Sequence, residues 1–164
     1  MIDAALMAQA SEVLERCRRR GWRLATAESC TGGLIAGALT EIAGSSDVVE
    51  AGFVTYSNAA KHSMLGVPMP LFESVGAVSR EVATAMAEGA LVQLPQVTLS
   101  VAVTGIAGPG GATPGKPVGL VHFALARRGR PTETRHAVFP GDRSTVRRAT
   151  VALALTMLSE AAGN

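Results

Sequence analysis

A hydroxyl and a thiol stand side by side in the segment Ala27-Glu28-Ser29-Cys30-Thr31-Gly32-Gly33, between a β-like run over 22–26 and a helical pattern that begins at Leu34. The first N–H groups of a helix have no intrahelical partner and carry the positive end of its dipole, so they can stabilise an oxyanion formed beside such a turn. Gly32 and Gly33 would also let a ligand approach the backbone closely. The same pattern suits a Ser or Thr helix cap, so the segment taken alone leaves a nucleophile and a cap equally open.

A tyrosine and a lysine follow the next strand-like segment, 48–56. Tyr56 stands at its end, and Lys61 stands one turn into a helix expected over 58–65. Ligands of open α/β sheets gather at the carboxyl ends of strands, where Ser29 and Thr104 are also expected. A lysine becomes a general base only if burial or nearby positive charge lowers its pKa; otherwise Lys61 is a solvated helix residue.

Two further segments could hold an anion. The glycine-rich loop 105–116 follows a buried-strand pattern over 97–104, but it lacks the Gly-Lys-Ser/Thr ending of a phosphate loop and precedes a strand. Its N–H groups could still bind an anion, or the loop could be a long turn. Arg143 stands at the start of the last helical pattern, where it could bind a phosphate with two hydrogen bonds or remain an exposed arginine.

Helical and strand-like segments alternate along the chain. Helices are expected over 3–20, from 34 onward, over 58–65, 80–94 and 144–162, and strands over 22–26, 48–56, 97–104, 118–126 and 134–139. A loop is expected after Gly66, because Pro68 and Pro70 follow it. The alternation predicts an α/β fold, a three-layer α/β/α sandwich with helices on both faces of a mixed, mostly parallel sheet. The 164 residues suit one domain, 1–164.

Composition excludes several classes of protein. The net charge of +2 gives no general case for nucleic-acid binding, and no apolar run approaches the ~20 residues of a membrane span. Cys17 and Cys30 form no disulfide framework and, without a signal peptide, favour a reducing cytoplasm. No spacing of His, Cys, Asp or Glu indicates a metal site, and none of the three histidines fits a catalytic triad.

Six motifs occur in one order along the chain. They are Ala-Glu-Ser-Cys-Thr-Gly-Gly (27–33), Val-Thr-Tyr-Ser-Asn with a lysine (54–58 and 61), Gly-Ala-Val-Ser (76–79), Thr-Gly-Ile-Ala-Gly-Pro-Gly-Gly (104–111), Lys-Pro-Val-Gly (116–119) and Phe-Pro-Gly-Asp-Arg (139–143). In this order they resemble the CinA C-terminal domain family, the nicotinamide mononucleotide (NMN) amidases, over roughly residues 5–160. We expect the stand-alone form, without the molybdopterin-binding-like domain that some members carry.

The resemblance implies that the chain hydrolyses the carboxamide of NMN, giving nicotinate mononucleotide and ammonia and recycling pyridine nucleotide toward NAD, without a cofactor or metal. It implies Ser29 as the nucleophile, Lys61 as the general base and Tyr56 as its accompanying tyrosine. An α/β/α sandwich and a homo-oligomer, a dimer or higher, follow from the same resemblance.

Amide hydrolysis also needs an oxyanion stabiliser, and NMN brings a 5′-phosphate. We expect N–H groups around Cys30, Thr31, Gly32 and Gly33 to hold the oxyanion. For the phosphate, the candidates are Arg143 and the backbone of the glycine-rich loop, and the substrate-binding set there is Thr104, Gly105, Gly108 and Gly110. Lys116 is a weaker candidate.

Two alternatives stay open. Cys30 could be the nucleophile, because a thiol at a helix N-terminus can have a lowered pKa. The chain could instead be a non-catalytic nucleotide-binding or regulatory module, tied to competence or DNA damage. The near-neutral charge and the few aromatic side chains give that second alternative little support.

Overall fold

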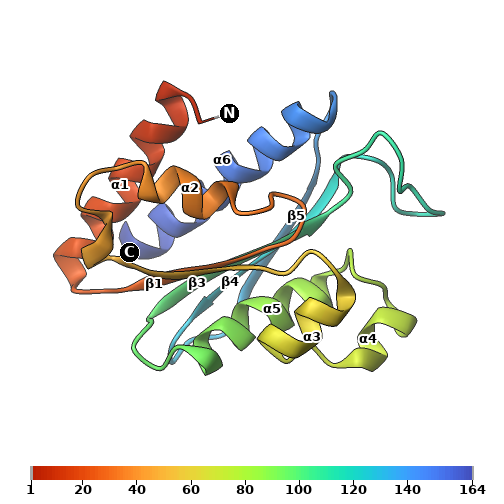
Figure 1. Ribbon diagram of the computed structural model, residues 1–164, viewed down its shortest axis with the longest axis horizontal. Coiled ribbons are helices and arrows are strands. Elements are labelled where there is room, and N and C mark those ends of the chain that lie inside the picture. Colours follow the sequence, from red (N-terminus) through yellow and green to blue (C-terminus); the bar gives the residue numbers. More distant parts are fainter. Residues whose placement is uncertain (1, 164) are drawn as a thin grey trace.

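One five-stranded sheet forms the centre of the protein, for which a computed structural model describes residues 2–163. Its strands lie in the order β2-β1-β3-β4-β5 (Figure 1). Their bounds are β1 Leu24–Glu28, β2 Val49–Val54, β3 Leu99–Gly105, β4 Leu120–Arg127 and β5 Glu133–Val138. Strand β1 pairs in parallel with β2 and β3, whereas β4 runs antiparallel to both β3 and β5. Four of the strands therefore share one direction, which confirms the mixed, mostly parallel sheet.

Helices cover both faces of the sheet, so the predicted three-layer α/β/α sandwich is confirmed (Figure 1). One face carries α1 (Ala4–Arg20), α2 (Leu34–Thr40) and α6 (Arg143–Gly163), and the other carries α3 (Asn58–Leu65), α4 (Met69–Ser74) and α5 (Arg80–Gln93). A short 3₁₀ turn, Ser45–Asp47, precedes β2. The apolar residues of the chain separate accordingly into two cores, one under each helical layer. Strands β1 and β3 contribute to both cores because successive side chains of a strand point to opposite faces.

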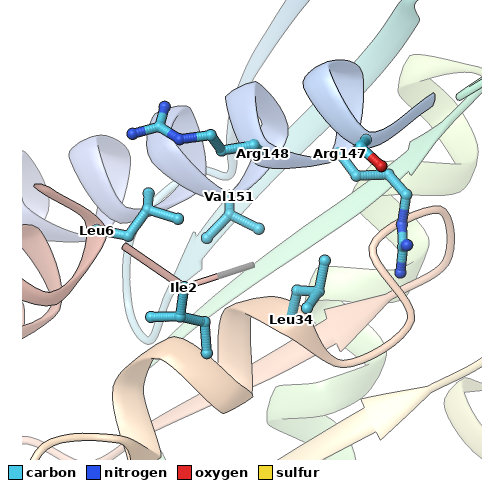
Figure 2. A pocket seen from close by; sticks show the side chains of 7 residues that line it. Ile2, Leu6, Leu34, Arg147, Arg148 and Val151 are labelled. Atoms are coloured by element: carbon cyan, nitrogen blue, oxygen red, sulfur yellow. The ribbon is translucent and has the colours of Figure 1, made fainter. Parts of the chain in front are cut away.

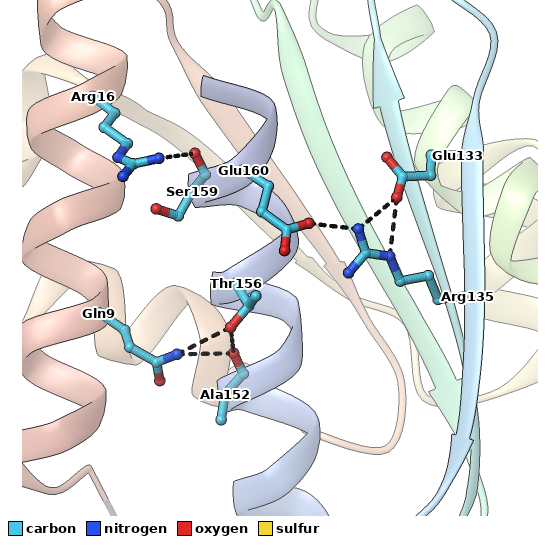
Figure 3. A network of polar contacts seen from close by, with 8 residues as sticks. All are labelled: Gln9, Arg16, Glu133, Arg135, Ala152, Thr156, Ser159 and Glu160. Atoms are coloured by element: carbon cyan, nitrogen blue, oxygen red, sulfur yellow. Dashed lines mark hydrogen bonds and ion pairs between the residues drawn. The ribbon is translucent and has the colours of Figure 1, made fainter. Parts of the chain in front are cut away.

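Side chains along the last helix, α6, form hydrogen bonds with α1 and an ion pair with the edge strand β5 (Figure 3). The amide of Gln9 donates to the Ala152 carbonyl at 3.3 Å and to Thr156 Oγ1 at 3.1 Å. Further along, Arg135 of β5 forms ion pairs with both Glu133 and Glu160. These contacts hold α6 in place, and its first turns lie near the turn that follows β1.

Local signals account for most helix ends. Asp3, Ser57 and Ser79 each accept a hydrogen bond from a backbone N–H as N-caps, and Gly21 ends α1 in the left-handed conformation with φ of 66°. Within residues 2–163 no helix combines the length and the apolar character that a membrane span requires.

The structure corrects the prediction for the segment after Gly66 and the position of β1. The segment after Gly66 is not only a loop, because Met69–Ser74 forms α4. Proline does not prevent this helix, since Pro68 serves as its N-cap and Pro70 stands in the first turn, where a missing N–H breaks no intrahelical hydrogen bond. Strand β1 also lies about two residues later than predicted, so Ser29 follows its last residue directly.

Candidate active site

A cavity of about 260 Å³ opens at the carboxyl ends of β1 and β3, with the segment after β2 along one side. It brings together segments far apart in the chain, as expected for an open α/β sheet. The residues that line it are Ser29, Cys30, Tyr56, Asn58, Lys61, Ala77, Val78, Thr104, Gly105, Ile106, Ala107, Gly108, Gly110, Gly111 and Arg143.

Ser29 and Lys61 are in direct contact in this cavity. Lys61 is only 1% exposed, and its Nζ lies 2.8 Å from Ser29 Oγ. The same Nζ donates to the Thr55 carbonyl at 2.8 Å and to the Tyr56 carbonyl at 3.1 Å. Carbonyl oxygens can only accept, so an uncharged amine would spend both N–H bonds on them. Its lone pair would then face Ser29 Oγ, which is the arrangement that a base needs to take a hydroxyl proton.

Burial lowers the pKa of Lys61 from 10.5 to about 8, and a smaller effect of Cys30 opposes this shift. No carboxylate forms an ion pair with Lys61 among the described residues. A pKa near 8 leaves about one Lys61 in ten uncharged at pH 7. The structure therefore supplies a lysine that can act as a base near neutral pH.

Glu28, and not Ser29, binds the free N–H groups at the start of α2. Its buried carboxylate accepts hydrogen bonds from the N–H groups of Ile35 and Ala36, at 2.9 and 3.0 Å. It also accepts from the Thr31 hydroxyl at 2.6 Å and from the Thr26 hydroxyl at 3.1 Å. The N-cap of α2 is Gly33, which makes no side-chain cap bond. The serine-cap interpretation is therefore wrong, and the Ser29 hydroxyl is left to Lys61.

The same arrangement limits which N–H groups can meet an oxyanion. Those of Ile35 and Ala36 are engaged by Glu28, and Thr31, Gly32 and Gly33 do not line the cavity. Of the four residues expected to hold the oxyanion, only Cys30 is part of the cavity wall. The expectation that the free N-terminus of α2 supplies the donors is corrected accordingly.

Tyr56 and Arg143 join two sides of the cavity mouth. Arg143 donates through Nη2 to the Tyr56 hydroxyl at 3.0 Å and through Nη1 to the Gly108 carbonyl at 2.8 Å. The Tyr56 side chain is 61% exposed, and only its main-chain carbonyl contacts Lys61. The structure thus places the phenol with Arg143 and gives it no hydrogen bond to Lys61. Thr104, also at the cavity wall, donates to the Ala77 carbonyl at 2.9 Å.

Cys30 lies beside Ser29 but is poorly suited to attack. Its side chain is buried, and burial raises the pKa of the thiol from 9.0 to about 11. A reactive cysteine needs a lowered pKa, so the premise of the cysteine alternative is not met. Within the part of the chain that the structure describes, no group of three His, Cys, Asp or Glu side chains could hold a metal ion.

Three contributors were given no role by the sequence analysis: Glu28, the Thr55 carbonyl, and Arg147, which donates to the Cys30 and Thr31 carbonyls. The helix face of Arg147 could have been predicted, because Arg147 stands four residues after Arg143, but its partners on the Ser29 turn could not. Backbone carbonyls and a buried carboxylate that caps a helix leave no comparable signal in a single sequence.

Comparison with known proteins identifies the family of this chain. The model of the family described as "CinA C-terminal domain" matches residues 7–162. This chain belongs to the CinA C-terminal domain family. A CinA-like protein of Mycolicibacterium vanbaalenii is 52% identical over 141 residues, and one of Akkermansia muciniphila is 47% identical over 166 residues. The matches cover 86% and 98% of this chain but 33% and 40% of those proteins, so the chain spans about a third to two fifths of their length.

Solved structures of CinA proteins share the whole fold. A competence/damage-inducible protein from Agrobacterium tumefaciens superposes with a TM-score of 0.95 at 47% identity, covering 100% of this chain and 99% of that one. A CinA superfamily protein from Escherichia coli gives a TM-score of 0.90 at 36% identity, covering 96% and 92%. These likenesses establish the family and the fold of this chain.

Proposed function

We propose that this protein is an amidohydrolase that converts NMN and water to nicotinate mononucleotide and ammonia. The observation that carries the proposal is the contact of 2.8 Å between Ser29 Oγ and the buried Lys61 Nζ, at the wall of a cavity. A serine paired with a lysine of lowered pKa is a known solution for splitting an amide, because the base activates a hydroxyl that is otherwise a weak nucleophile.

In the first step, Ser29 Oγ attacks the carboxamide carbon while uncharged Lys61 takes the hydroxyl proton. The carbonyl oxygen becomes an oxyanion, for which the Cys30 N–H at the cavity wall is the candidate donor. Protonated Lys61 then gives its proton to the amide nitrogen. The C–N bond breaks, ammonia leaves and a nicotinoyl ester remains on Ser29.

In the second step, water attacks the ester carbon and Lys61 takes a proton from it. The ester bond breaks, the proton returns to Ser29 Oγ and nicotinate mononucleotide leaves. The cationic pyridinium of NMN would add to burial in keeping Lys61 uncharged, since a nearby positive charge disfavours protonation. We assign the 5′-phosphate to Arg143, which is exposed at the cavity mouth and offers a planar, bidentate donor.

The test is ammonia and nicotinate mononucleotide release from NMN by wild type, Ser29→Ala and the matched control Ser46→Ala. Ser46 is an exposed serine outside the cavity. We expect Ser29→Ala to lose at least about 10³-fold in kcat and Ser46→Ala to match wild type. Full activity in Ser29→Ala would eliminate the mechanism. Binding of NMN by wild type without product would favour the non-catalytic module instead.

A further inference from the structure

Arg147 reaches from α6 to the turn that carries Ser29. Its Nε donates to the Cys30 carbonyl at 3.1 Å and its Nη2 donates to the Thr31 carbonyl at 3.2 Å. Figure 2 shows this side chain leaving α6 and pointing toward the loop that precedes Leu34. The contact joins two parts of the chain that lie 117 residues apart, so it belongs to the tertiary fold and not to either element alone.

The arginines around Arg147 have other partners. Arg148, the next residue, points away from the turn in Figure 2 and forms an ion pair with Asp3 at the surface. Arg143, one turn earlier, holds Tyr56 and Gly108. Arg147 forms no ion pair with a carboxylate among residues 2–163, and its guanidinium serves main-chain oxygens of the turn. This half-buried arginine therefore binds the backbone of the Ser29 turn and not a carboxylate.

Holding a carbonyl also orients the next N–H, because a peptide unit is planar and its C=O and N–H point in opposite directions. Arg147 thereby fixes the peptide units that contain the N–H groups of Thr31 and Gly32. The Gly32 N–H points back to the Ser29 carbonyl, to which it donates at 3.0 Å. Gly32 adopts φ of 58°, which suits glycine and closes the turn tightly. Arg147 and this internal hydrogen bond together define how Ser29 is presented.

We propose that Arg147 is a positioning residue for the proposed hydrolysis: its two hydrogen bonds hold the Ser29 turn in register with Lys61. The positive guanidinium also favours the negative charge that develops on the substrate's carbonyl oxygen during acylation of Ser29. This inference rests on the proposed function. Arg147 contacts neither Ser29 Oγ nor Lys61, so it acts on catalysis only through the backbone of Cys30 and Thr31.

The first experiment compares kcat and KM for NMN in wild type, Arg147→Ala, Arg147→Lys and the control Arg148→Ala. We expect Arg147→Ala to lower kcat about 30- to 100-fold and to change KM by less than about threefold, because the turn is misplaced while the substrate contacts remain. Arg147→Lys should keep part of the activity, since an ammonium cannot bridge two carbonyls as a guanidinium does. Arg148→Ala should match wild type.

Added methylguanidinium separates positioning from folding. It should restore kcat of Arg147→Ala at least about fivefold by occupying the vacated place, with no effect on Arg148→Ala. A folded Arg147→Ala variant with kcat within twofold of wild type would overturn the inference. So would a loss of kcat that follows only the unfolded fraction in circular dichroism, with no rescue in Arg147→Ala and full activity in Arg147→Lys.

A second readout does not depend on NMN. A fluorophosphonate probe, which forms an O–P bond to an activated serine hydroxyl with loss of fluoride, is followed on Ser29 by intact-mass spectrometry. We expect labelling of Arg147→Ala to be slowed by about the same factor as kcat, and labelling of Arg148→Ala to be unchanged. Equal rates in wild type and Arg147→Ala would overturn the role of Arg147. Labelling that depends on Arg147 in a protein that releases no ammonia from NMN would overturn the proposed substrate and support the positioning role.

Discussion

The two ends of the parallel strands treat positive charge in opposite ways. At the amino ends of β1 and β2, Arg23 pairs with Glu50, and Arg18 pairs with Asp47 at 2.7 Å. These guanidinium groups are partly or largely exposed, and the hydrogen bond to Asp47 raises the pKa of Arg18. At the carboxyl ends, Lys61 is buried without an ion-pair partner among the described residues, and its pKa falls to about 8. Pairing with a carboxylate further favours the charged form of an arginine that is charged at any working pH, whereas burial makes a lysine into a base.

This difference between the two ends depends on which groups the acidic side chains contact. Glu28 is the one buried carboxylate of the described residues, and it lies in the sequence directly before Ser29. Its oxygens are committed to the Ile35 and Ala36 N–H groups and to two threonine hydroxyls. The N–H groups at the start of α2 therefore engage Glu28, and Lys61 is left without a counter-ion among residues 2–163. A carboxylate paired with Lys61 would keep the lysine protonated and inactive.

The largest loss of activity is expected when Lys61 is replaced by a residue that cannot lose its proton. Lys61→Arg keeps a positive charge at every working pH, so it cannot take the Ser29 proton, and we expect kcat to fall at least about 10³-fold. Lys61→Met removes the amine at similar length and should lose activity to the same extent. Ammonia release is the measurement, and circular dichroism confirms the fold. A Lys61→Met variant that retains a tenth of the activity would contradict the account.

The dependence of kcat/KM on pH tests the lowered pKa of Lys61. The base form of Lys61 is the uncharged amine, which becomes populated as pH rises through its pKa of about 8. We therefore expect kcat/KM for NMN to rise about tenfold per pH unit below that value and to level off above it. Stopped assays of ammonia between pH ~6.5 and pH ~9.5 measure this. A flat profile across that range would mean that no group titrating near 8 controls the reaction.

Arg143 shares one property with each end of the strands. It is exposed, like Arg18 at the amino ends, and it pairs with no carboxylate among the described residues, like Lys61. We expect Arg143→Gln to raise KM for NMN about 10- to 100-fold and to change kcat by less than about threefold, since a phosphate contact made in both ground and transition states is lost. Nicotinamide riboside, which lacks the phosphate, is the matched control, and its kcat/KM should be unaffected. An equal loss on both substrates would remove the phosphate assignment.

The smallest effect is expected at the amino ends. Arg18→Gln removes an exposed ion pair with Asp47 and leaves the cavity untouched. We expect activity within about 20% of wild type and a thermal midpoint lowered by less than about 3 °C, because exposed ion pairs contribute little. Thermal unfolding and the ammonia assay measure both. A large loss of activity would show that the two ends of the sheet are coupled.

The parts of the site that follow the parallel strands could be predicted from the sequence. Ser29, Lys61 and Thr104 come after or at the ends of strands, and parallel strands bring such ends to one edge of the sheet. The direction of individual side chains could not be predicted in this way. The Tyr56 phenol turns to Arg143 and not to Lys61, because the contact depends on where α6 begins.

Other parts were beyond a local pattern. Helix α4 was not predicted, because its two prolines suggested a loop. Each of them occupies a position where a helix tolerates proline. The capping role of Glu28 is a contact between the end of β1 and the second residue of α2, and Arg147 acts across 117 residues. Both contacts are set by how the layers pack, which periodicity and propensity do not encode.

The proposed mechanism depends on the ionisation of Lys61, and the chain contains only two lysines, Lys61 and Lys116. Protein labelled with ¹³C at lysine Cε therefore gives two signals, and Lys61→Arg identifies that of Lys61. We expect its chemical shift to titrate with a midpoint near pH 8. A midpoint at or above the ordinary lysine value of 10.5 would contradict the account, because Lys61 would then be charged when Ser29 needs a base.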